Sequence, residues 1–251
     1  TLFRSNLIWT IIQDSKNNIW VGNQGGGLNL FDINKKEFQH FVNDPNNPRT
    51  LSHNTVLTMI EDKDSNLWIG TNYGINKMIR GNDGQLSFEN YTVKDGLPDN
   101  NIQSILLDDK GFMWIGTNKG LSKFDTRKLT FENFDVSDGI RSNEFFVHAC
   151  YKRKSTGELM FGSNKGFNIF YPDNIKQDLF PPKVVITDFL LFNNQVQIGA
   201  RIDDDIILNK SITETKELVL SYKHNIISFE FAALNFAAPD KNSFAYILEG
   251  F

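Results

Sequence analysis

Six side chains in the loops of this chain carry groups that bind polar, oxygen-rich ligands. They are an imidazole, an aromatic ring, two cations, an amide and a carboxylate: His53, Tyr73, Lys119, Arg141, Asn143 and Glu144. Amide and carboxylate groups can make paired hydrogen bonds to hydroxyls, a ring can stack on a sugar, and Lys or Arg can bind a sulfate or a uronate. The set therefore predicts a carbohydrate or glycosaminoglycan ligand.

A purely structural role competes with ligand binding at such positions. Asn follows Thr in a recurring Thr-Asn-x-Gly motif, and we attribute that Asn to the turn because the turn itself needs it. His53, Tyr73, Lys119 and Arg141 differ between the copies of the motif, so repetition does not explain them. These four positions are the stronger candidates for ligand contact.

The sequence contains no nucleophile elbow, zinc-protease motif, phosphate-binding loop or dinucleotide-binding turn, so we predict no catalytic residue and no cofactor. The segment 62–66 (D-x-D-x-N) matches the start of a calcium loop. It lacks the later glycine and the bidentate Glu, so it predicts a hairpin turn and no metal site. A glycan-cleaving enzyme stays open as an alternative, because Asp95, Asp99 and Glu144 could meet across a cleft.

These loops need a repeated element to position them, and a repeat is visible. A Trp-x-Gly block occurs three times, at Trp20/Gly22, Trp68/Gly70 and Trp114/Gly116, and a degenerate fourth copy occurs at Met160/Gly162. The glycines are spaced 48, 46 and 46 residues apart (22→70→116→162). A period in the forties with strand-like sequence is typical of a β-propeller, so we predict an all-β fold with four four-stranded antiparallel blades of a seven-bladed ring.

The third repeat shows the expected order of strands within a blade. Alternation and turn residues predict strands at 101–108, 112–117, 121–124 and 129–134. A large indole can fill the wedge between adjacent blades, and the glycine two positions later leaves room for a neighbouring residue. Met160 replaces the indole in the fourth copy, so we expect that junction to pack differently.

The repeat ends after Tyr171, and a rigid connection containing Pro181 and Pro182 follows. Further strands are predicted at 184–192, 217–220, 226–232 and 244–248. Their spacing and turn content suggest the opening strands of a β-sandwich. We therefore predict propeller blades at residues 1–180 and an incomplete Ig-like sandwich at residues 181–251.

Bulk composition limits the classes of partner. The 251 residues carry a formal net charge of −4 with 22% charged residues, which argues against a nucleic-acid partner. No apolar run reaches the length of a membrane span. The single cysteine, Cys150, lies in a strand-like run and is predicted to be a small buried residue. The abrupt start at Thr1 and the end directly after a strand suggest a piece of a longer protein.

The ordered blocks resemble a known family. The W-I-G-T blades, with linkers such as Asp95–Asn101, resemble the two-component regulator propeller repeat, and Phe145–Pro172 resembles the closing blade of such arrays. Pro181–Phe189 resembles the beginning of a Y-Y-Y domain, and Tyr246–Phe251 resembles part of its body. The resemblance covers nearly the whole chain.

This resemblance implies the periplasmic sensor region of a Bacteroides-type hybrid two-component system. In such systems the membrane helix, histidine kinase, receiver and DNA-binding domain lie outside the region that this chain covers. The family usually detects oligosaccharides released from a polysaccharide and controls transcription of the genes for its breakdown. The resemblance thus implies an oligosaccharide ligand, a homodimer formed through the complete Y-Y-Y domain, and membrane attachment only through downstream segments. A protein-interaction scaffold is the remaining alternative.

Overall fold

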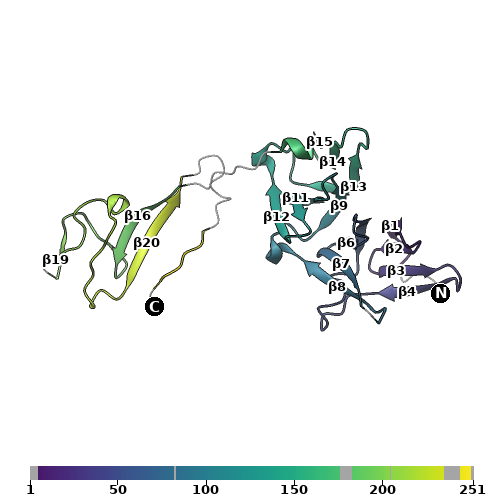
Figure 1. Ribbon diagram of the computed structural model, residues 1–251, viewed down its shortest axis with the longest axis horizontal. Coiled ribbons are helices and arrows are strands. Elements are labelled where there is room, and N and C mark those ends of the chain that lie inside the picture. Colours follow the sequence, from purple (N-terminus) through teal and green to yellow (C-terminus); the bar gives the residue numbers. More distant parts are fainter. Residues whose placement is uncertain (1–4, 82, 176–182, 204, 235–243, 250–251) are drawn as a thin grey trace. The chain divides into compact units, whose positions relative to one another are not determined.

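The computed structural model describes residues 5–81, 83–175, 183–203, 205–234 and 244–249. It contains two compact units, Thr1–Lys176 and Gln177–Phe251, which we call unit 1 and unit 2 (Figure 1). Each unit has its own buried apolar clusters. The predicted domain boundary between residues 180 and 181 lies outside the described residues.

Three four-stranded antiparallel sheets follow one another in unit 1, and we call them blades 1, 2 and 3. Blade 1 contains β1 (Ile8–Gln13), β2 (Ile19–Asn23), β3 (Gly27–Asp32) and β4 (Glu37–Phe41). Blade 2 contains β5 (Val56–Glu61), β6 (Leu67–Thr71), β7 (Gly74–Arg80) and β8 (Leu86–Tyr91). Blade 3 contains β9 (Ile102–Leu107), β10 (Met113–Thr117), β11 (Gly120–Asp125) and β12 (Thr130–Phe134). The first strands of successive blades, β1, β5 and β9, contact one another, as the inner strands of a propeller do.

Within the described residues, blade 4 is a three-stranded sheet of β13 (Phe145–Lys152), β14 (Leu159–Ser163) and β15 (Gly166–Phe170), with β13 packed beside β9. This corrects the prediction of four strands in every blade. The 3₁₀ helix Pro172–Asn174 follows β15 almost directly. Proline fixes φ and has no backbone N–H for a β-ladder, so the chain cannot turn back at once into a fourth strand.

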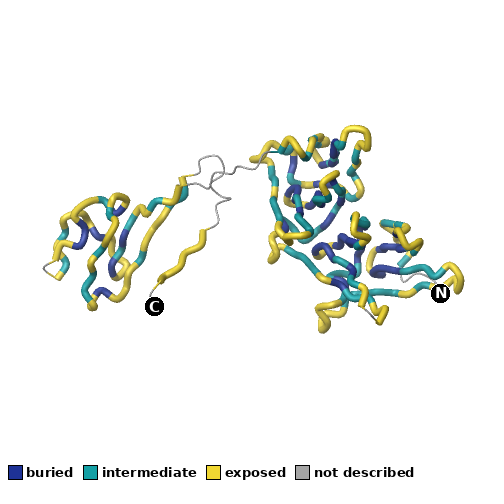
Figure 2. The backbone as a smooth tube through the Cα atoms, in the orientation of Figure 1, coloured by how far each residue is buried: buried dark blue, intermediate teal, exposed yellow. Residues whose placement is uncertain are grey.

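The three indoles fill the wedges between blades, as predicted. Trp20, Trp68 and Trp114 are each 0% exposed. Trp20 of blade 1 shares its core cluster with Val56 and Phe88 of blade 2, and the other two indoles are buried in the same way against blades 3 and 4. Figure 2 shows buried residues in the interior of unit 1 and exposed residues at many of its turns, and the second strands β2, β6 and β10 are buried along most of their length. Burial of each indole contributes about 3 kcal/mol to stability.

The glycine two positions after each of the first two indoles is required by the next blade. A methyl group on Gly22 would lie 2.5 Å from Cγ1 of Val56, and one on Gly70 would lie 2.6 Å from Cγ2 of Ile102. Val56 and Ile102 begin the inner strands of blades 2 and 3. A residue larger than glycine would therefore push neighbouring blades apart.

Gly116 and Gly162 also make room for neighbouring residues, but their nearest neighbours lie in their own blades. A methyl group on Gly116 would first meet Oγ of Ser104 in its own blade, at 2.6 Å, and only then Cβ of Phe145 in blade 4, at 3.1 Å. At Gly162 the nearest atoms all belong to Ala149 of the same blade, with Cβ at 2.9 Å. Within the described residues of unit 1 no blade follows blade 4, so Gly162 makes room for its own inner strand and not for a neighbouring blade.

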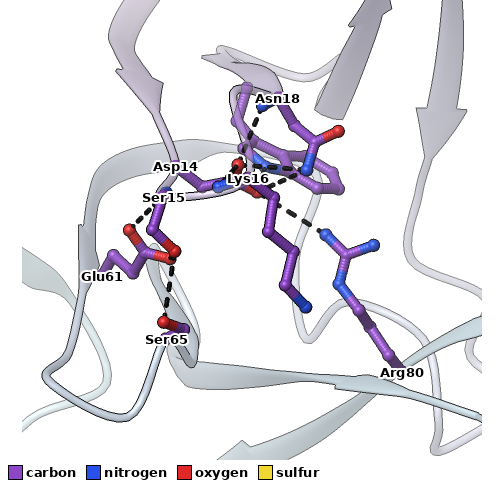
Figure 3. Close-up of polar contacts among 8 residues, drawn as sticks. Asp14, Ser15, Lys16, Asn18, Glu61, Ser65 and Arg80 are labelled. Atoms are coloured by element: carbon purple, nitrogen blue, oxygen red, sulfur yellow. Dashed lines mark hydrogen bonds and ion pairs between the residues drawn. The ribbon is translucent and has the colours of Figure 1, made fainter.

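An aspartate in the first hairpin turn of a blade holds the indole. The carboxylate of Asp14 accepts hydrogen bonds from Nε1 of Trp20 (2.9 Å) and from the backbone N–H groups of Lys16 (3.0 Å) and Asn18 (2.8 Å) (Figure 3). Burial disfavours the ionised carboxylate, but the hydrogen bonds from Trp20 and Asn18 outweigh it, so the pKa of Asp14 lies below its ordinary value. The same carboxylate caps the turn and orients the indole.

Polar contacts of Asp14 and Ser15 join blades 1 and 2 at these hairpin turns. The guanidinium of Arg80 lies 3.5 Å from the Asp14 carboxylate, and the Ser15 hydroxyl donates to Glu61 at 2.7 Å (Figure 3). Arg80 and Glu61 belong to blade 2, so both contacts cross the junction. The junction between blades 1 and 2 thus has an apolar core around Trp20 and polar contacts between the blades at the end with the hairpin turns.

Unit 2 contains a three-stranded antiparallel sheet in the order β17 (Asn194–Gln195), β16 (Val184–Leu191), β20 (Ile227–Ala233). It also has a small hairpin of β18 (Arg201–Ile202) and β19 (Asp205–Ile206), and a 3₁₀ helix at Ile212–Glu214. The sandwich itself stays a prediction.

Two of the strands predicted for unit 2 are wrong, because 217–220 and 244–248 are not strands. Leu218 and Leu220 pack against the unit 2 core, and the Phe244 ring lies 5.0 Å from that of Phe231. At 217–220 the alternation marks the side chains that pack on the core without a neighbouring strand, whereas residues 244–248 are exposed.

Candidate functional site

One end of the blades is built from the turns between second and third strands and from the loops that lead into the next blade. We call this end the loop face. A backbone hydrogen bond joins turn to loop at each junction: Gly27 N donates to Asn54 O (2.8 Å), Gly74 N to Asn100 O (2.6 Å) and Gly120 N to Asn143 O (2.7 Å). The turns and loops are thereby fixed to one another at all three junctions.

The glycine of each turn permits this close approach. Gly74 has φ of 96°, which favours glycine, and a methyl group there would lie 2.4 Å from the backbone O of Tyr91. Gly120 repeats the arrangement against Phe134, with φ of 126° and a separation of 2.5 Å. The end of the fourth strand thus packs on the turn and fixes where the loop starts.

Asn143 occupies a position that recurs in every loop. Its Oδ1 accepts from Val136 N (3.0 Å), and the equivalent Asn100 accepts from Val93 N (2.9 Å). Asn54 accepts from the backbone of its own loop in the same way, at 2.7 Å. The side-chain oxygen of Asn143 therefore holds the loop, although its residue type alone placed it among the candidates for ligand contact.

His53 also supports its loop. Its Nδ1 accepts a hydrogen bond from Thr55 N (3.0 Å). The equivalent Asp99 and Ser142 accept from the backbone N–H two residues on, at 2.8 and 3.0 Å. In the neutral ring the proton must then sit on Nε2, which is the group that a ligand could meet.

Tyr73 and Lys119 occupy equivalent turn positions on adjacent blades. The backbone N–H of each donates to the hydroxyl of the preceding Thr, at 3.0 and 3.1 Å, so the backbone holds the turn in both. The side chains take no part in holding the turn and are exposed, Tyr73 by 50% and the Lys119 side chain by 74%. The Lys119 Nζ lies 4.0 Å from the Asp99 carboxylate of the neighbouring loop.

Arg141 and Glu144 lie in the loop that leads into blade 4, and both are exposed. The backbone N of Arg141 donates to Asn168 Oδ1 (3.0 Å), and among the described side chains its guanidinium forms no ion pair. Arg141 lines a hollow of about 500 Å³ together with Phe167. The carboxylate of Glu144 accepts a hydrogen bond from the Asn164 side chain.

The loop face carries all six predicted residues. In the part of the chain that the structure describes, no two of them bond directly to each other. Their assignment as ligand contacts stays a prediction. Each carboxylate considered for glycan cleavage has a partner nearby. Asp95 caps the 3₁₀ helix Val93–Asp95. Asp99 accepts a hydrogen bond from Asn101 N and lies 4.0 Å from Nζ of Lys119, and Glu144 accepts one from the Asn164 side chain.

A wide bulge in β13 was not predicted. Phe145 pairs with Ser163 and Cys150 with Phe161, so the partner strand spans the same stretch in fewer residues. His148, inside the bulge, has φ of 57°, which is uncommon for a residue other than glycine. The bulge exposes Phe146, at 54%, just after Glu144. The spacing in the sequence does indicate extra residues in blade 4. The first strand begins 17 positions before the repeat glycine there (145 to 162), but 14 positions before it in blade 3 (102 to 116).

The opposite end of the blades carries the hairpin aspartates. The carboxylate of Asp62 accepts from the backbone N–H groups of Asp64 and Asn66 (2.9 Å each) and from Nε1 of Trp68 (2.8 Å), which confirms the hairpin turn. Burial opposes ionisation, but the hydrogen bonds from Trp68 and Asn66 outweigh it and lower the pKa of Asp62. Over the described ranges, no cluster of three or more His, Cys, Asp or Glu side chains is placed to hold a metal ion.

Cys150 is half-buried on β13, where its Sγ lies 3.9 Å from the backbone O of Ile105. Burial raises the pKa of this thiol, which disfavours the reactive thiolate. Among the helices of the described residues, none has the length and apolar character needed to cross a membrane.

Comparison with known proteins gives a relative of much greater length. The chain is 30% identical over 251 residues to histidine kinase P4 of Formosa agariphila. The match takes in 98% of this chain and 18% of that kinase, so the chain spans less than a fifth of its relative.

Two solved structures share the fold. The extracellular domain of a hybrid two-component system of B. thetaiotaomicron matches with a TM-score of 0.66 and 22% identity, over 96% of this chain and 31% of that one. The extracellular domain of a one-component system of the same organism matches with a TM-score of 0.52 and 21% identity, over 93% and 29%.

The family model for the two-component regulator propeller matches residues 3–25, 50–73 and 96–119. Each matched segment runs from the loop before a blade to the turn between its second and third strands, so it contains the Asp–Trp hairpin and the wedge glycine. Blades 1, 2 and 3 of this chain contain two-component regulator propeller repeats.

Proposed function

We propose that this chain is the extracytoplasmic, periplasmic ligand-sensing part of a hybrid two-component histidine kinase. Its loop face binds an oligosaccharide and does not cleave it. Three observations support the proposal: the regulator propeller repeats, the relative that is a histidine kinase, and the similar fold of an extracellular two-component domain. The kinase activity itself belongs to residues outside this chain.

The observation that carries the ligand-binding proposal is the contrast between Tyr73 and Lys119 and the repeated residues around them. Repeated side chains such as Asn143 are used to hold the loops. Tyr73 and Lys119 hold the turn through their backbone and leave their side chains exposed. Residues that the fold does not need, at a position shared by adjacent blades, are where recognition can vary without loss of stability.

The chemistry of the loop face favours an anionic or partly anionic glycan. A tyrosine ring offers a stacking surface for a sugar ring, and Arg141 and Lys119 offer cations for a carboxylate or sulfate. Lys119 is only loosely paired, since its Nζ stands 4.0 Å from Asp99. A ligand anion can therefore replace Asp99 at low cost.

Binding must reach the kinase through a change in the arrangement of two subunits. We propose that the complete domain that begins in unit 2 forms the dimer and transmits this change, with membrane attachment through downstream segments. Light scattering on a polypeptide extended past Phe251, with and without ligand, tests this step. An unchanged monomer in both states contradicts it.

The ligand proposal is tested by calorimetric titration of the chain with neutral, uronate-containing and sulfated oligosaccharides. We expect one class to bind, and Tyr73→Ala and Lys119→Ala to weaken that binding about tenfold or more without lowering the melting temperature. Lys128→Ala and Tyr222→Ala are matched controls, since Lys128 lies in an exposed turn at the opposite end of blade 3 and Tyr222 in unit 2. Absence of binding to every glycan, or release of cleaved product, contradicts the proposal.

A further inference from the structure

The first strand of every blade contains a β-bulge at the end nearest the loop face. In blades 1, 2 and 3 one residue is skipped in the pairing with the second strand: Trp9, Leu57 and Gln103. In blade 4 the skipped stretch is 146–149. A bulge bends the strand and changes the direction of a side chain, and bulges are frequent next to active sites.

The side chain at the bulge differs from blade to blade, although the backbone repeats. Trp9 is 41% exposed and Phe146, the first bulged residue of blade 4, is 54% exposed, whereas Leu57 is buried. Gln103 is the polar member of the set and is half-buried. The fold therefore requires the bulge and not a particular residue in it, so the side chain can vary with a ligand.

Gln103 joins the loop that leads into blade 3 to the turn between β10 and β11. Its Nε2 donates to Oδ1 of Asn101 in the loop (3.1 Å) and to Oδ1 of Asn118 in the turn (2.9 Å). We call these three side chains the amide cluster. An amide nitrogen carries two hydrogens, and both are used here, so the orientation of the Gln103 side chain is fixed.

The amide cluster leaves hydrogen-bonding groups open on the loop face. Among the described residues, Oε1 of Gln103 and Nδ2 of Asn118 have no hydrogen-bond partner, and Asn118 is exposed. The Thr-Asn-x-Gly motif predicts a role for Asn118 in the turn, but over the described ranges its side chain bonds only to Gln103. The cluster thus offers an acceptor and a donor in fixed positions, which suits a sugar hydroxyl.

Blade 2 shows that the turn does not need the amide cluster. There the Thr71 hydroxyl donates to Gly74 O at 2.9 Å, and in blade 3 the Thr117 hydroxyl makes the equivalent bond at 2.8 Å. Blade 2 carries Leu57 where blade 3 carries Gln103, yet the turn closes in the same way. The free groups of the cluster can therefore serve a ligand without loss of the turn.

Phe146 lies beside the amide cluster. β13 packs against β9 (Figure 1), and a methyl group on Gly116 would lie 3.1 Å from Cβ of Phe145. Gly116 in turn pairs with Ser104, the residue after Gln103. Phe146 and Gln103 each adjoin this contact in sequence, so an exposed ring and the amide cluster share the junction of blades 3 and 4.

The bulge that carries Phe146 is held at both of its ends. Phe145 is buried at the junction with blade 3, and Cys150 resumes the pairing with β14. His148, between them, has φ of 57°, a conformation that costs energy in a residue other than glycine. Strain of this kind persists where the surrounding structure fixes it, and it is concentrated at binding and catalytic sites.

We infer that the amide cluster and Phe146 form a sugar-binding subsite at the junction of blades 3 and 4. A sugar ring stacks on Phe146, and its hydroxyls bond Oε1 of Gln103 and Nδ2 of Asn118. The inference rests on the proposed oligosaccharide function and extends it. Lys119 follows Asn118 directly, so a neutral ring in the subsite places an anionic group of the neighbouring sugar unit near the lysine.

The inference is tested by calorimetric titration of the 251-residue chain with maltotetraose, tetragalacturonate and a sulfated κ-carrageenan tetrasaccharide. We expect Gln103→Leu to weaken the binding of an acidic probe about three- to tenfold, because the hydrogen bonds of the amide cluster are lost. Phe146→Leu should weaken it about threefold or more, because the stacking surface is lost. Both variants should keep the melting temperature, since blade 2 carries leucine at the first position and the Phe146 ring is exposed.

Three further variants separate stacking and hydrogen bonding from general effects of substitution. Phe146→Tyr keeps the ring and should keep the affinity. Tyr151→Leu and Gln13→Leu are matched controls, because both residues lie at the hairpin end of their strands, away from the loop face. A loss with Tyr151→Leu equal to that with Phe146→Leu would overturn the inference.

Nuclear magnetic resonance of the isotope-labelled chain gives a direct readout of the amide cluster. The side-chain amide signal of Gln103, identified by its absence from Gln103→Leu, should shift when the bound probe is added. If Tyr73→Ala and Lys119→Ala weaken binding but Gln103→Leu and Phe146→Leu do not, the proposed function stands and the subsite is wrong. If none of the three probes binds, the proposed function and the subsite both fail.

Discussion

The carboxylate of Asp62 accepts a hydrogen bond from the indole N–H of Trp68 at 2.8 Å, across the first hairpin of blade 2. Blades 1 and 3 repeat the contact at the same spacing, between Asp14 and Trp20 at 2.9 Å and between Asp108 and Trp114 at 3.1 Å. In blade 4 both partners are replaced, by Arg153 and Met160. The two residues form one unit, because a buried N–H and a buried carboxylate each need a partner.

This pairing makes the stability of unit 1 sensitive to acid. Because the pKa of Asp62 is lower in the folded protein than its ordinary 3.8, the ionised carboxylate stabilises the fold. That contribution is complete above the unfolded pKa and is lost as the pH falls through the folded pKa. We expect the stability difference between the unchanged chain and Asp62→Asn to be constant above about pH 5 and to shrink below about pH 4.

Urea unfolding followed by tryptophan fluorescence measures this difference, since all four tryptophans lie in unit 1. Asp64→Asn is the matched control, because it removes a charge from the same turn without a contact to Trp68. A difference that does not vary between about pH 2.5 and 6 would contradict the role given to Asp62.

Loss of an indole should be far more costly than loss of an exposed side chain of the same blade. Trp114→Ala empties a buried wedge between blades 3 and 4, so we expect a loss of about 3–5 kcal/mol. Lys119→Ala should change the free energy of unfolding by less than about 0.5 kcal/mol. Urea unfolding of both variants is the measurement, and equal losses would mean that the wedge contributes little.

The close contact between Gly70 and Ile102 predicts a coupled effect. Gly70→Ala puts a methyl group 2.6 Å from Cγ2 of Ile102, so we expect a loss of about 1–3 kcal/mol. Ile102→Ala removes that Cγ2 and should recover part of the loss in the double variant. Unfolding free energies of the two single variants and the double variant form the cycle, and strict additivity would argue against the steric explanation.

Much of unit 1 could be predicted because its sequence repeats. The strand predicted at 112–117 is β10 at Met113–Thr117, and that predicted at 129–134 is β12 at Thr130–Phe134. Aligning the copies shows which residues recur in every blade, and are therefore needed by the fold, and which occur in one blade only. The same alignment hides that Gly162, unlike Gly22 and Gly70, faces its own blade, because a repeat does not say which copy is last. Unit 2 offers no second copy, so alternation alone remained, and alternation does not say whether a strand pairs nearby.

The position of the loop face could be predicted from the sequence, but not which of its side chains hold the loops and which are left exposed. The sequence identified the loops correctly. His53 differs from its counterparts in residue type, yet its Nδ1 accepts the same backbone hydrogen bond that the side chains of Asp99 and Ser142 accept in the other loops. Three different side chains provide the same acceptor, and residue identity hides that equivalence. The bulge in β13 had a count of extra residues as its signal, but a count does not say whether they lengthen the strand or the turn.

The ion pair between Asp14 and Arg80 supplies a test of the blade 1 and blade 2 junction. Arg80→Ala leaves the buried Asp14 with its hydrogen bonds but without the cation at 3.5 Å, so we expect a loss of about 1 kcal/mol. The Arg80 side chain is 37% exposed, and about 0.5 M salt should therefore reduce the loss. Arg127→Ala, at an exposed turn of blade 3, is the control and should have little effect. Urea unfolding at both salt concentrations measures it, and a loss that salt does not reduce would show that Arg80 acts through packing and not through charge.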